Sequence, residues 1–414
     1  MEHSIGVLGI GVLLLLAWLA STNRRIIGWG PIIVALALQG GIAWIALRTG
    51  LGAWLFDLAT ELAVAFIGYA DQGIEFMFGR WPEEVLGSEG EPLRLPFVFA
   101  IRVLPILIFM ASVFSVLYHL GILQRVVNFL ARGLRWAMRI SGAESLATIG
   151  NIFLGMTESP LLVRPYVAAM TRSELFCVMT AGLATVAGTV LVAYIGILGG
   201  ELAGHLIAAS FMSAPAAVAI AKIMVPEEGK PQTLGGARIQ VDRGSANLID
   251  AAANGAAEGL RLALNVGAML IAFVALIYML DDALGWLGGL LGHPDLSFAG
   301  ILGVVLAPLT WLLGVPWSDA QAVGQMLGVK TIFNEFLAYQ MLADASATLE
   351  PRSVVIASYA LCGFANFGSL AILLGGLGGI APERRGDIAR DGIRAICAGS
   401  IATFLTGAIA GLLL

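Results

Sequence analysis

The chain has 414 residues, of which 58% are hydrophobic and only 12% are charged. Because a soluble domain carries about 25% charged residues, this composition excludes a soluble globular protein and indicates a helical membrane protein with several crossings. The formal net charge of −5 neither favours nor excludes a partner, because in such a protein the charges lie in loops and must be read by side.

Several apolar runs reach roughly 20 residues, the length that crosses the hydrocarbon core of a membrane. They predict eight spanning helices, at residues 4–22, 27–47, 95–119, 173–198, 203–224, 258–280, 353–378 and 391–413. The first run resembles a signal peptide, but it has no basic stretch before it and Arg24 and Arg25 follow it. This order predicts a first spanning helix that is retained.

The charged loop residues differ between the two sides of the predicted membrane. Arginine and lysine gather in alternate loops, at Arg24, Arg25, Arg125, Arg132, Arg135, Arg139, Lys222, Lys230, Arg238, Arg243, Arg384, Arg385, Arg390 and Arg394. The opposite loops carry Glu83, Glu84, Glu89, Glu91, Asp281, Asp282 and Asp295. Because basic loops stay in the cytoplasm, we predict both termini on the periplasmic side, in agreement with an even number of crossings.

Three segments mix charged and apolar residues. Residues 52–78 carry four acidic residues, which predicts an amphipathic helix in the outer interface. Residues 121–140 show the same pattern with arginines on the cytoplasmic side. Residues 297–314 are more apolar and are compatible with either an interfacial or a spanning helix.

Two further stretches, residues 142–170 and 316–345, are too interrupted to span. Such backbone is tolerated at membrane depth only where protein or a watery cavity surrounds it, so we predict two re-entrant hairpins. Each contains an acidic residue, Glu158 in the first and Glu335 in the second. A carboxylate in the bilayer costs roughly 2.5 to 3.5 kcal/mol on insertion scales and usually marks a substrate or ion path.

The order of elements then repeats as interfacial helix, hairpin, broken spanning helix and spanning helix. The loop charges place the two hairpins on opposite sides, which predicts an inverted repeat with its axis in the membrane plane. The predicted fold is therefore an all-α polytopic membrane protein with eight transmembrane helices, two re-entrant hairpins and interfacial helices. Its parts are scaffold helices (1–119), repeat 1 (120–224), a cytoplasmic loop with a scaffold helix (225–282) and repeat 2 (283–414). We assign no function to the polar loop 226–247.

The first hairpin and the helix after it offer groups for an ion. Ser159-Pro160 suits a helix start, with serine as N-cap, whose free amides would face a site beside Glu158. The alternative is a Glu158 paired with an arginine such as Arg164. Glycines and threonines over 182–191 could unwind a turn and free carbonyls for Na⁺, with Asn151 and Thr185 as side-chain donors. Thr185 could instead bond back to its own helix.

The second hairpin offers groups for a sugar. Asn334 and Glu335 lie in it, and the following broken helix reads Cys362-Gly-Phe-Ala-Asn-Phe-Gly-Ser369. A carboxylate, two amides and a serine suit vicinal hydroxyls, and Phe364 suits stacking on a planar ring. The alternative is helix packing through Asn366 and the small residues after it.

Three long motifs, at 155–166, 334–339 and 362–369, closely resemble those of the concentrative nucleoside transporters of the bacterial, sodium-coupled type. The resemblance extends over essentially the whole chain and includes residues 21–25, 262–270 and 381–390. It implies a homotrimer whose protomers transport independently. It also implies an outer scaffold and a moving transport domain, built from the hairpins and their helices, that works like an elevator.

The resemblance also assigns roles to residues. The nucleobase side comprises Gly155, Met156, Thr157, Glu158, Val190 and Phe364, and the ribose side comprises Glu335, Asn366 and Ser369. The Na⁺ ligands are the side chains of Asn151 and Thr185 and the carbonyls of Leu154 and Val186. Apart from Asn334, the ion and sugar candidates chosen from the residues alone are among these.

Met156 departs from the family pattern, which has glutamine at this position. Methionine offers only a weak sulfur acceptor and apolar contact, whereas glutamine both donates and accepts. We therefore predict a changed base preference with transport retained. The alternative is that this side chain packs against a helix and a water replaces the amide.

The sequence thus predicts Na⁺-driven nucleoside uptake across a bacterial-type inner membrane, with nucleoside, lipid bilayer and two further copies of the chain as partners and no nucleic acid. A proton-coupled nucleoside or nucleobase symporter with Glu158 as proton carrier is the alternative. An intramembrane hydrolase is disfavoured, because no Gly-x-Ser-x-Gly or His-Glu-x-x-His motif is present and no histidine lies near either carboxylate. A channel would not need two chemically different hairpins.

Overall fold

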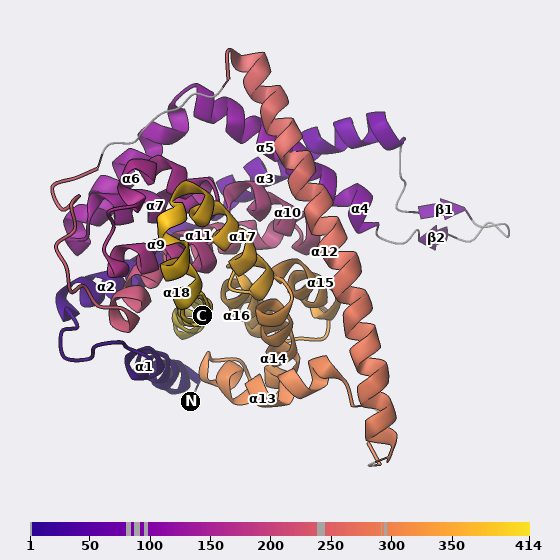
Figure 1. The fold of residues 1–414 in the computed structure, drawn as a ribbon. Coiled ribbons are helices and arrows are strands. Elements are labelled where there is room, and N and C mark those ends of the chain that lie inside the picture. The colour runs from indigo at the N-terminus through magenta and orange to yellow at the C-terminus, as the bar shows by residue number, and fades with distance from the viewer. Residues whose placement is uncertain are drawn as a thin grey trace.

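The computed structural model describes residues 2–79, 84–86, 92–94, 98–237, 245–290, 292–293 and 296–414. These residues are almost entirely helical (Figure 1). The strands in the described part of the chain are β1 (Glu84–Leu86) and β2 (Pro92–Arg94), which pair in antiparallel fashion with Val85 opposite Leu93. Some residues used above to assign sides lie outside the described part: Glu83, Glu89, Glu91, Arg238, Arg243 and Asp295.

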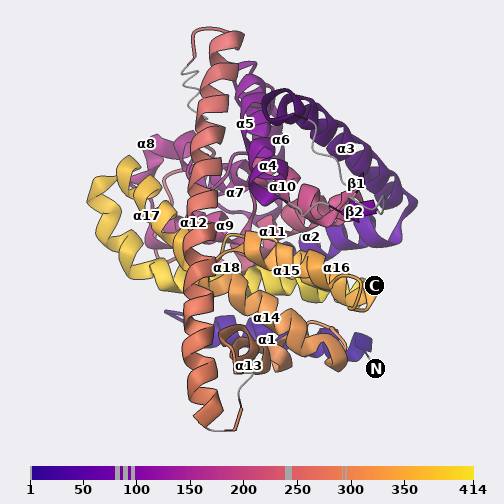
Figure 2. The same ribbon diagram turned by 90° about the vertical axis from the view of Figure 1, so that its right-hand side faces the viewer.

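The helices before the first hairpin form the outer part of the molecule. They are α1 (Glu2–Leu19), α2 (Trp29–Arg48), α3 (Gly50–Phe78), α4 (Phe99–Arg102) and α5 (Leu104–His119). The long helix α12 (Leu248–Leu290) runs along one side and packs against α5 (Figures 1 and 2). Its 43 residues exceed the predicted span 258–280, because the helix continues through the polar residues on both sides of the apolar run.

The remaining helices follow the predicted order twice. Repeat 1 contains α6 (Ile122–Met138), α7 (Gly142–Phe153), the 3₁₀ turn η1 (Ser159–Val163), α8 (Arg164–Val167), α9 (Arg172–Ala184), α10 (Gly188–Leu198), η2 (Gly200–Leu202) and α11 (Ala203–Met224). Repeat 2 contains α13 (Phe298–Leu312), α14 (Trp317–Ile332), α15 (Glu335–Ala345), α16 (Pro351–Leu361), α17 (Phe367–Ile380), η3 (Pro382–Arg384) and α18 (Arg385–Leu413). Each copy thus has a hairpin interrupted at its tip, then a helix broken in the middle.

By length and composition, seven helices among the described residues can cross a membrane, or eight if the pair α13–α14, bent by 117°, counts as one span. The set differs from the predicted one. Helix α3 is long and apolar enough to cross, although we predicted it to lie in the interface, and that placement remains a prediction. The predicted span 353–378 consists of α16 and α17, of which only α17 counts as a short apolar helix.

Two capping boxes fix the start of the first hairpin and of the helix that follows it. Ser141 accepts from the Glu144 backbone N–H over 3.2 Å, and the Glu144 carboxylate accepts from the Ser141 N–H over 2.9 Å. Thr171 and Glu174 repeat this arrangement at the start of α9, over 3.1 and 2.9 Å. Each box satisfies amides that the first turn of a helix leaves unpaired, so the sequence itself defines where both helices begin.

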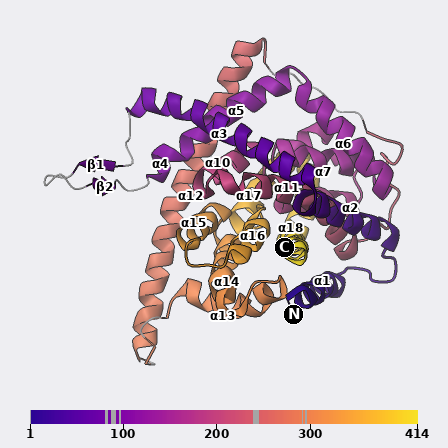
Figure 3. The same ribbon diagram turned by 180° about the vertical axis from the view of Figure 1, so that it is seen from behind.

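The buried core lies in the repeats. In the most apolar windows of α9–α10, of α11 and of α18, 89%, 83% and 72% of residues are buried, against 6% in α12. Seen from behind, α3 crosses the outside of this core near α10 and α11 (Figure 3). Both chain ends reach the same side of the molecule (Figure 2). The outer helices expose large apolar side chains, as expected of surfaces that face lipid.

Candidate functional site

Asn151 and Thr185 meet where the first hairpin is interrupted. Asn151 lies in the last turn of α7, and Thr185 follows the last residue of α9. The Asn151 Nδ2 donates to Thr185 Oγ1 over 2.6 Å and to the Ala181 carbonyl over 2.8 Å. From the start of η1, Ser159 Oγ donates to Asn151 Oδ1 over 3.3 Å. Three side chains from three elements therefore converge at one buried point.

The predicted alternative for Thr185 is present as well. Its Oγ1 donates to the Ala181 carbonyl of its own helix over 2.9 Å. A hydroxyl has one donor and two acceptor lone pairs, so Thr185 bonds back to α9 and still accepts from Asn151. The helix bond orients the hydroxyl oxygen toward the hairpin.

The oxygens at this point suit a Na⁺ ion. The side chains that meet here, Asn151, Thr185 and Ser159, offer neutral oxygens. Among the described residues, no backbone N–H donates to the Leu154 or the Val186 carbonyl, one just after α7 and the other within the break after α9. Gly155 follows with φ +96°, a left-handed turn that favours glycine. A hard cation prefers such oxygen ligands.

The start of η1 differs from the prediction. Glu158, rather than Ser159, occupies the N-cap, and its side chain makes no capping bond. Ser159 bonds to Asn151 instead, so the serine fastens the hairpin tip and does not cap it. The helix is a 3₁₀ turn of five residues, too short for a strong dipole.

The hairpin tip carries the residues predicted for the nucleobase. Thr157 and Glu158 are exposed, whereas Gly155 and Met156 are buried. No ion pair joins Glu158 to Arg164 in the described part of the chain.

Two glycines mark what the tip packs against. A Cβ added to Gly182 in α9 would lie 3.2 Å from the Met156 Cβ, so Met156 packs against that helix. A Cβ on Gly376 in α17 would lie 3.2 Å from Thr157 Cγ2. The tip of the first hairpin therefore touches the second half of the broken helix of repeat 2.

Glu335 lies buried at the start of α15. Its Oε1 accepts from the Tyr194 hydroxyl over 2.8 Å, and its Oε2 accepts from Asn366 Nδ2 over 2.9 Å. Asn366 also caps α17, where its Oδ1 accepts from the Ser369 N–H over 2.7 Å. The three residues predicted for ribose are thus linked, with Asn334 capping α15 beside them through the Leu337 N–H.

Tyr194 was not among the predicted site residues. It lies in α10 of repeat 1, 141 positions from Glu335 in the sequence. Its ring lies 4.5 Å from that of Tyr339 and 4.8 Å from that of Phe336, between centroids. Tyr339 in turn donates to the Ser358 carbonyl over 3.0 Å. This aromatic group ties the carboxylate of one repeat to a helix of the other.

Lys330 was missed too. It is fully buried in α14, where its Nζ donates to the Ala360 carbonyl and to Thr403 Oγ1, both over 2.8 Å. The Phe404 ring centroid lies 5.7 Å from the Nζ. A lysine in an apolar helix is a signal that sequence reading could have used, because a buried charge needs partners.

The two helix breaks cross each other. A Cβ on Gly363 would lie 2.6 Å from Thr403 Cγ2 and 2.8 Å from the Ala184 carbonyl oxygen, so only glycine fits at this crossing. Val190, in the first turn of α10, and Phe364, within the second break, are both buried. The ion candidates and the ribose candidates therefore belong to two breaks in contact.

Comparisons with known proteins agree over the whole chain. Family models described as the N-terminus and the C-terminus of Na⁺-dependent nucleoside transporters match residues 8–81 and 205–411, and a model described as nucleoside recognition matches residues 100–201. The chain is 43% identical to an uncharacterized transporter of Bacillus subtilis, YutK, with 98% of both chains covered. It is 39% identical to the nucleoside permease NupC of Helicobacter pylori, with 98% and 96% covered.

A human protein and two solved structures are similar to this chain as well. Human solute carrier family 28 member 3 is 40% identical over 98% of this chain and 59% of that protein. The structure of CNTnw in an inward-facing, substrate-bound state has 41% identity and a TM-score of 0.91, covering 100% and 98% of the two chains. A CNTnw variant in an outward-facing state has 40% identity and the same TM-score over the same shares.

These matches confirm the expected family and exclude an enzyme. They support sodium as the coupling ion. Relatives captured facing inward and facing outward indicate alternating access. The chain belongs to the family of Na⁺-dependent, concentrative nucleoside transporters.

Proposed function

We propose that this chain imports nucleosides into the cell by Na⁺ symport, through one site formed where the two helix breaks cross. The observation that carries the proposal is the pair of networks at that crossing: Asn151, Thr185 and Ser159 on one side, Glu335 and Asn366 on the other. Neutral oxygens suit the ion, and a buried carboxylate with an amide suits the vicinal hydroxyls of ribose.

The proposed roles follow this geometry. Asn151 and Thr185, with the carbonyls of Leu154 and Val186, hold Na⁺, and Ser159 joins them. Glu335, Asn366 and Ser369 bind the ribose. The nucleobase lies among the residues of the first hairpin and the two breaks, namely Gly155, Met156, Thr157, Glu158, Val190 and Phe364.

Coupling arises because the ion ligands close the hairpin tip. An ion held by Asn151 Oδ1 and Thr185 Oγ1 fastens the end of α7 to the break after α9, and Ser159, which bonds to the same Asn151 oxygen, extends this to the start of η1. The ordered tip then favours the nucleoside, and by linkage the nucleoside favours the ion by the same factor. One positive charge moving inward yields about 2.3 kcal/mol per 100 mV, which is about fifty-fold accumulation.

The proposed movement is an elevator. Helices α9, α10, α11 and α18 of the repeats form a buried unit, whereas α3, α5 and α12 have few buried residues and lie outside it. A compact body sliding along an outer frame is compatible with this division. A homotrimer held by the frame, an inner-membrane location and periplasmic termini complete the proposal, the last supported by chain ends that lie on one side (Figure 2).

A proton-coupled mechanism is the second candidate. The observation in its favour is Glu158, an acidic side chain at the tip of the first hairpin that makes no hydrogen bond in the described part of the chain. Acidic side chains at membrane depth are common members of proton relays in transporters.

The test is uptake of labelled uridine and adenosine into proteoliposomes, with an inward Na⁺ gradient compared with an equal K⁺ gradient at fixed pH. Accumulation only with Na⁺ is the expected result. Uptake that ignores Na⁺ and follows external acid would move the coupling role to Glu158. No uptake of either nucleoside would contradict the proposed substrate.

A further inference from the structure

Helix α6 has two apolar faces. One is buried against the protein and includes Leu123, Val127, Ala131, Leu134 and Met138. The other is exposed and consists of Ile122, Val126, Phe129 and Trp136, spaced by three, four or seven residues so that they share one side of the helix. Phe129 is 70% and Trp136 is 84% exposed. A second apolar stripe of this kind is typical of a helix that lies in a membrane interface.

Arginines border the exposed stripe on the side toward the polar loop. Arg132, Arg135 and Arg139 follow at spacings of three and four, and in the described part of the chain neither Arg135 nor Arg139 has an anionic partner. Other arginines of the cytoplasmic side are paired, for example Arg172, whose Nη2 lies 2.6 Å from Asp391 Oδ1. The α6 arginines therefore retain their capacity for an external anion.

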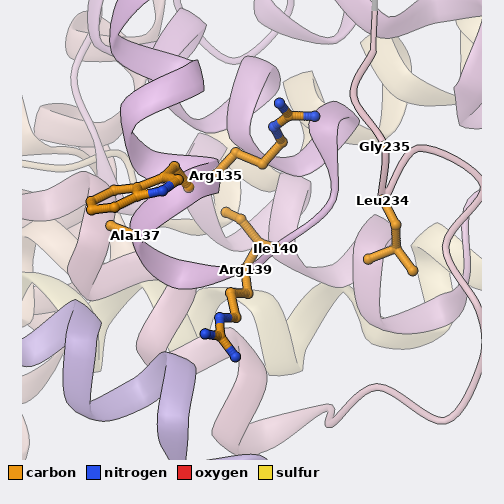
Figure 4. A pocket seen from close by; sticks show the side chains of 7 residues that line it. Arg135, Ala137, Arg139, Ile140, Leu234 and Gly235 are labelled. Atoms are coloured by element: carbon orange, nitrogen blue, oxygen red, sulfur yellow. The ribbon is translucent and has the colours of Figure 1, made fainter.

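A cavity of about 700 Å³ lies beside these arginines (Figure 4). Arg135, Trp136 and Arg139 line it from the end of α6, and Leu234 and Gly235 line it from the loop. A second cavity of about 270 Å³ shares Arg135 and Gly235 and extends the groove along α6 past Arg132. The larger volume lies in the range of small-ligand sites, and no residue predicted for nucleoside or ion lines either cavity.

We propose that this groove binds the headgroup of an anionic phospholipid. The phosphate lies against Arg139, which is exposed at the end of α6 and points away from Arg135 (Figure 4), and the acyl chains lie along Trp136 and Phe129. The lipid bridges α6 and the loop. Thr233, next to Leu234, accepts from the Gly142 N–H over 2.8 Å and from the Ala143 N–H over 3.0 Å at the start of α7. A bound lipid therefore steadies the start of the first hairpin.

The test uses the purified full chain in phosphatidylcholine nanodiscs titrated with brominated phosphatidylglycerol, which quenches tryptophan fluorescence. The chain has nine tryptophans, so the difference from Trp136→Phe isolates the signal of Trp136. We expect saturable quenching with a preference of about tenfold over brominated phosphatidylcholine. Arg135→Gln with Arg139→Gln should abolish the preference, and Arg125→Gln, an exposed arginine away from the groove, should keep it.

Several outcomes would overturn the proposal: equal quenching by both lipids, or a preference that survives in the double variant. Displacement of the lipid by inorganic phosphate alone at millimolar concentration would assign the groove to a free anion. If the double variant fails to fold, Arg139→Gln decides alone, because Arg139 is exposed at the end of α6. The preference of Arg139→Gln for brominated phosphatidylglycerol must then fall below that of the wild-type chain.

A second observation concerns Lys330 and Asn151, which have the same place in the two repeats. Asn151 lies two positions before Phe153, the last residue of α7, and Lys330 lies two positions before Ile332, the last residue of α14. Both donate to a carbonyl in the last turn of the helix that follows their hairpin, Ala181 in α9 and Ala360 in α16. Both also contact a threonine hydroxyl.

The partners of Lys330 suit an ammonium group. Its Nζ donates to two oxygens and lies 5.7 Å from the Phe404 ring centroid, within the range of a cation–π interaction. No carboxylate within salt-bridge distance is found among the described residues. In repeat 1 the corresponding oxygens accept from the neutral Asn151 Nδ2, so that position has no fixed positive charge.

We infer that the amine of Lys330 is the tethered counterpart of the coupling ion and positions the break at 362–366 that carries Phe364 and Asn366. This inference rests on the proposed sodium site. Repeat 1 is then ordered only when Na⁺ binds, whereas repeat 2 is ordered permanently. Lys330 acts as a positioning residue, because its own contacts are to protein oxygens.

The test compares uridine binding to the wild type, Lys330→Asn and Lys330→Met over a range of NaCl concentrations, with choline keeping ionic strength constant. For Lys330→Asn, which copies repeat 1, we expect affinity about tenfold lower at low Na⁺ and recovered at high Na⁺ with a steeper dependence. Lys330→Met should bind weakly at every concentration. The same affinity and Na⁺ curve as the wild type for Lys330→Asn would contradict the inference.

Thermal unfolding in the same salts keeps the test decisive. A Lys330→Asn chain that folds only at high Na⁺ supports a vacated cation position, and one that unfolds regardless of Na⁺ contradicts it. Wild-type binding that ignores Na⁺ would remove the proposed sodium site. That failure is seen without any variant and is therefore distinct from failure of the inference about Lys330.

Discussion

The two hairpins have the same order of elements but opposite chemistry. In the first, Glu158 is exposed and without a hydrogen bond, and the tip is fastened by the neutral groups of Asn151, Thr185 and Ser159. In the second, Glu335 is buried between Tyr194 and Asn366. Neutral side chains hold the first tip, whereas a buried carboxylate with two donors holds the second. The two copies therefore offer different chemistry to the proposed ion and the proposed sugar.

Removing the charge of Glu335 should have the largest effect. Glu335→Gln cannot accept two strong bonds from Tyr194 and Asn366, and loses the charge that a ribose hydroxyl would meet. Hydrogen bonds to charged groups contribute about 1.5–3 kcal/mol, so we expect uridine affinity to fall about a hundredfold. Equilibrium binding measures it. Unchanged affinity would show that Glu335 is a packing residue.

Removing an ion ligand should have a different signature. Thr185→Val keeps the shape of the side chain but loses the oxygen that Asn151 contacts. We expect the Na⁺ concentration for half-maximal uptake to rise about tenfold, with the maximal rate at saturating Na⁺ nearly unchanged. Thr403→Val is the matched control in repeat 2, because the Thr403 hydroxyl bonds back to its own helix and accepts from Lys330, as the Thr185 hydroxyl does with its helix and Asn151. An equal Na⁺ shift in both variants would contradict the assignment.

Tyr194→Phe tests the hydrogen bond from repeat 1 to Glu335 of repeat 2. The phenylalanine keeps the ring contacts to Tyr339 and Phe336 but cannot donate to Glu335. Loss of one bond to a charged acceptor predicts affinity lower by about tenfold, with no change in Na⁺ dependence. Measuring uridine binding at low and at high Na⁺ separates an effect on uridine affinity from an effect on Na⁺ dependence. A shifted Na⁺ curve would mean that the two hairpins are not chemically independent.

Met156→Gln should have the smallest effect. Met156 is buried against Gly182, so a glutamine must either reach the base or leave an amide unpaired. An added or lost hydrogen bond is worth about 1 kcal/mol, which is about a fivefold change in the ratio of purine to pyrimidine uptake. Competition by a panel of nucleosides measures the ratio. Identical profiles would favour packing of this side chain as its sole role.

The sequence predicted the parts of the fold that depend on local signals. Glycine and threonine over 182–191 predicted a break, which the structure places between Ala184 and Gly188. The motif 362–369 predicted the second break in the same way. Local signals did not predict the full length of α12, because polar residues can extend a helix beyond its apolar run.

The sequence predicted the site residues that lie within one repeat but not the contacts between the repeats. Asn151 and Thr185 were paired because both lie in repeat 1, and Asn366 and Glu335 because both lie in repeat 2. Tyr194 escaped prediction because it bonds across repeats, and Ser159 because a helix-start pattern suggested capping. Contacts between distant segments depend on how the breaks cross, which periodicity and motifs do not encode.

In the proposed mechanism, ion and nucleoside bind to neighbouring, coupled positions at the crossed breaks. Calorimetric titration of uridine in NaCl and in choline chloride, followed by titration of Na⁺ with and without uridine, measures this coupling from both sides. We expect Na⁺ to raise uridine affinity by the same factor by which uridine raises Na⁺ affinity, and Thr185→Val to reduce both. Uridine affinity that is equal in the two salts would contradict the proposed coupling.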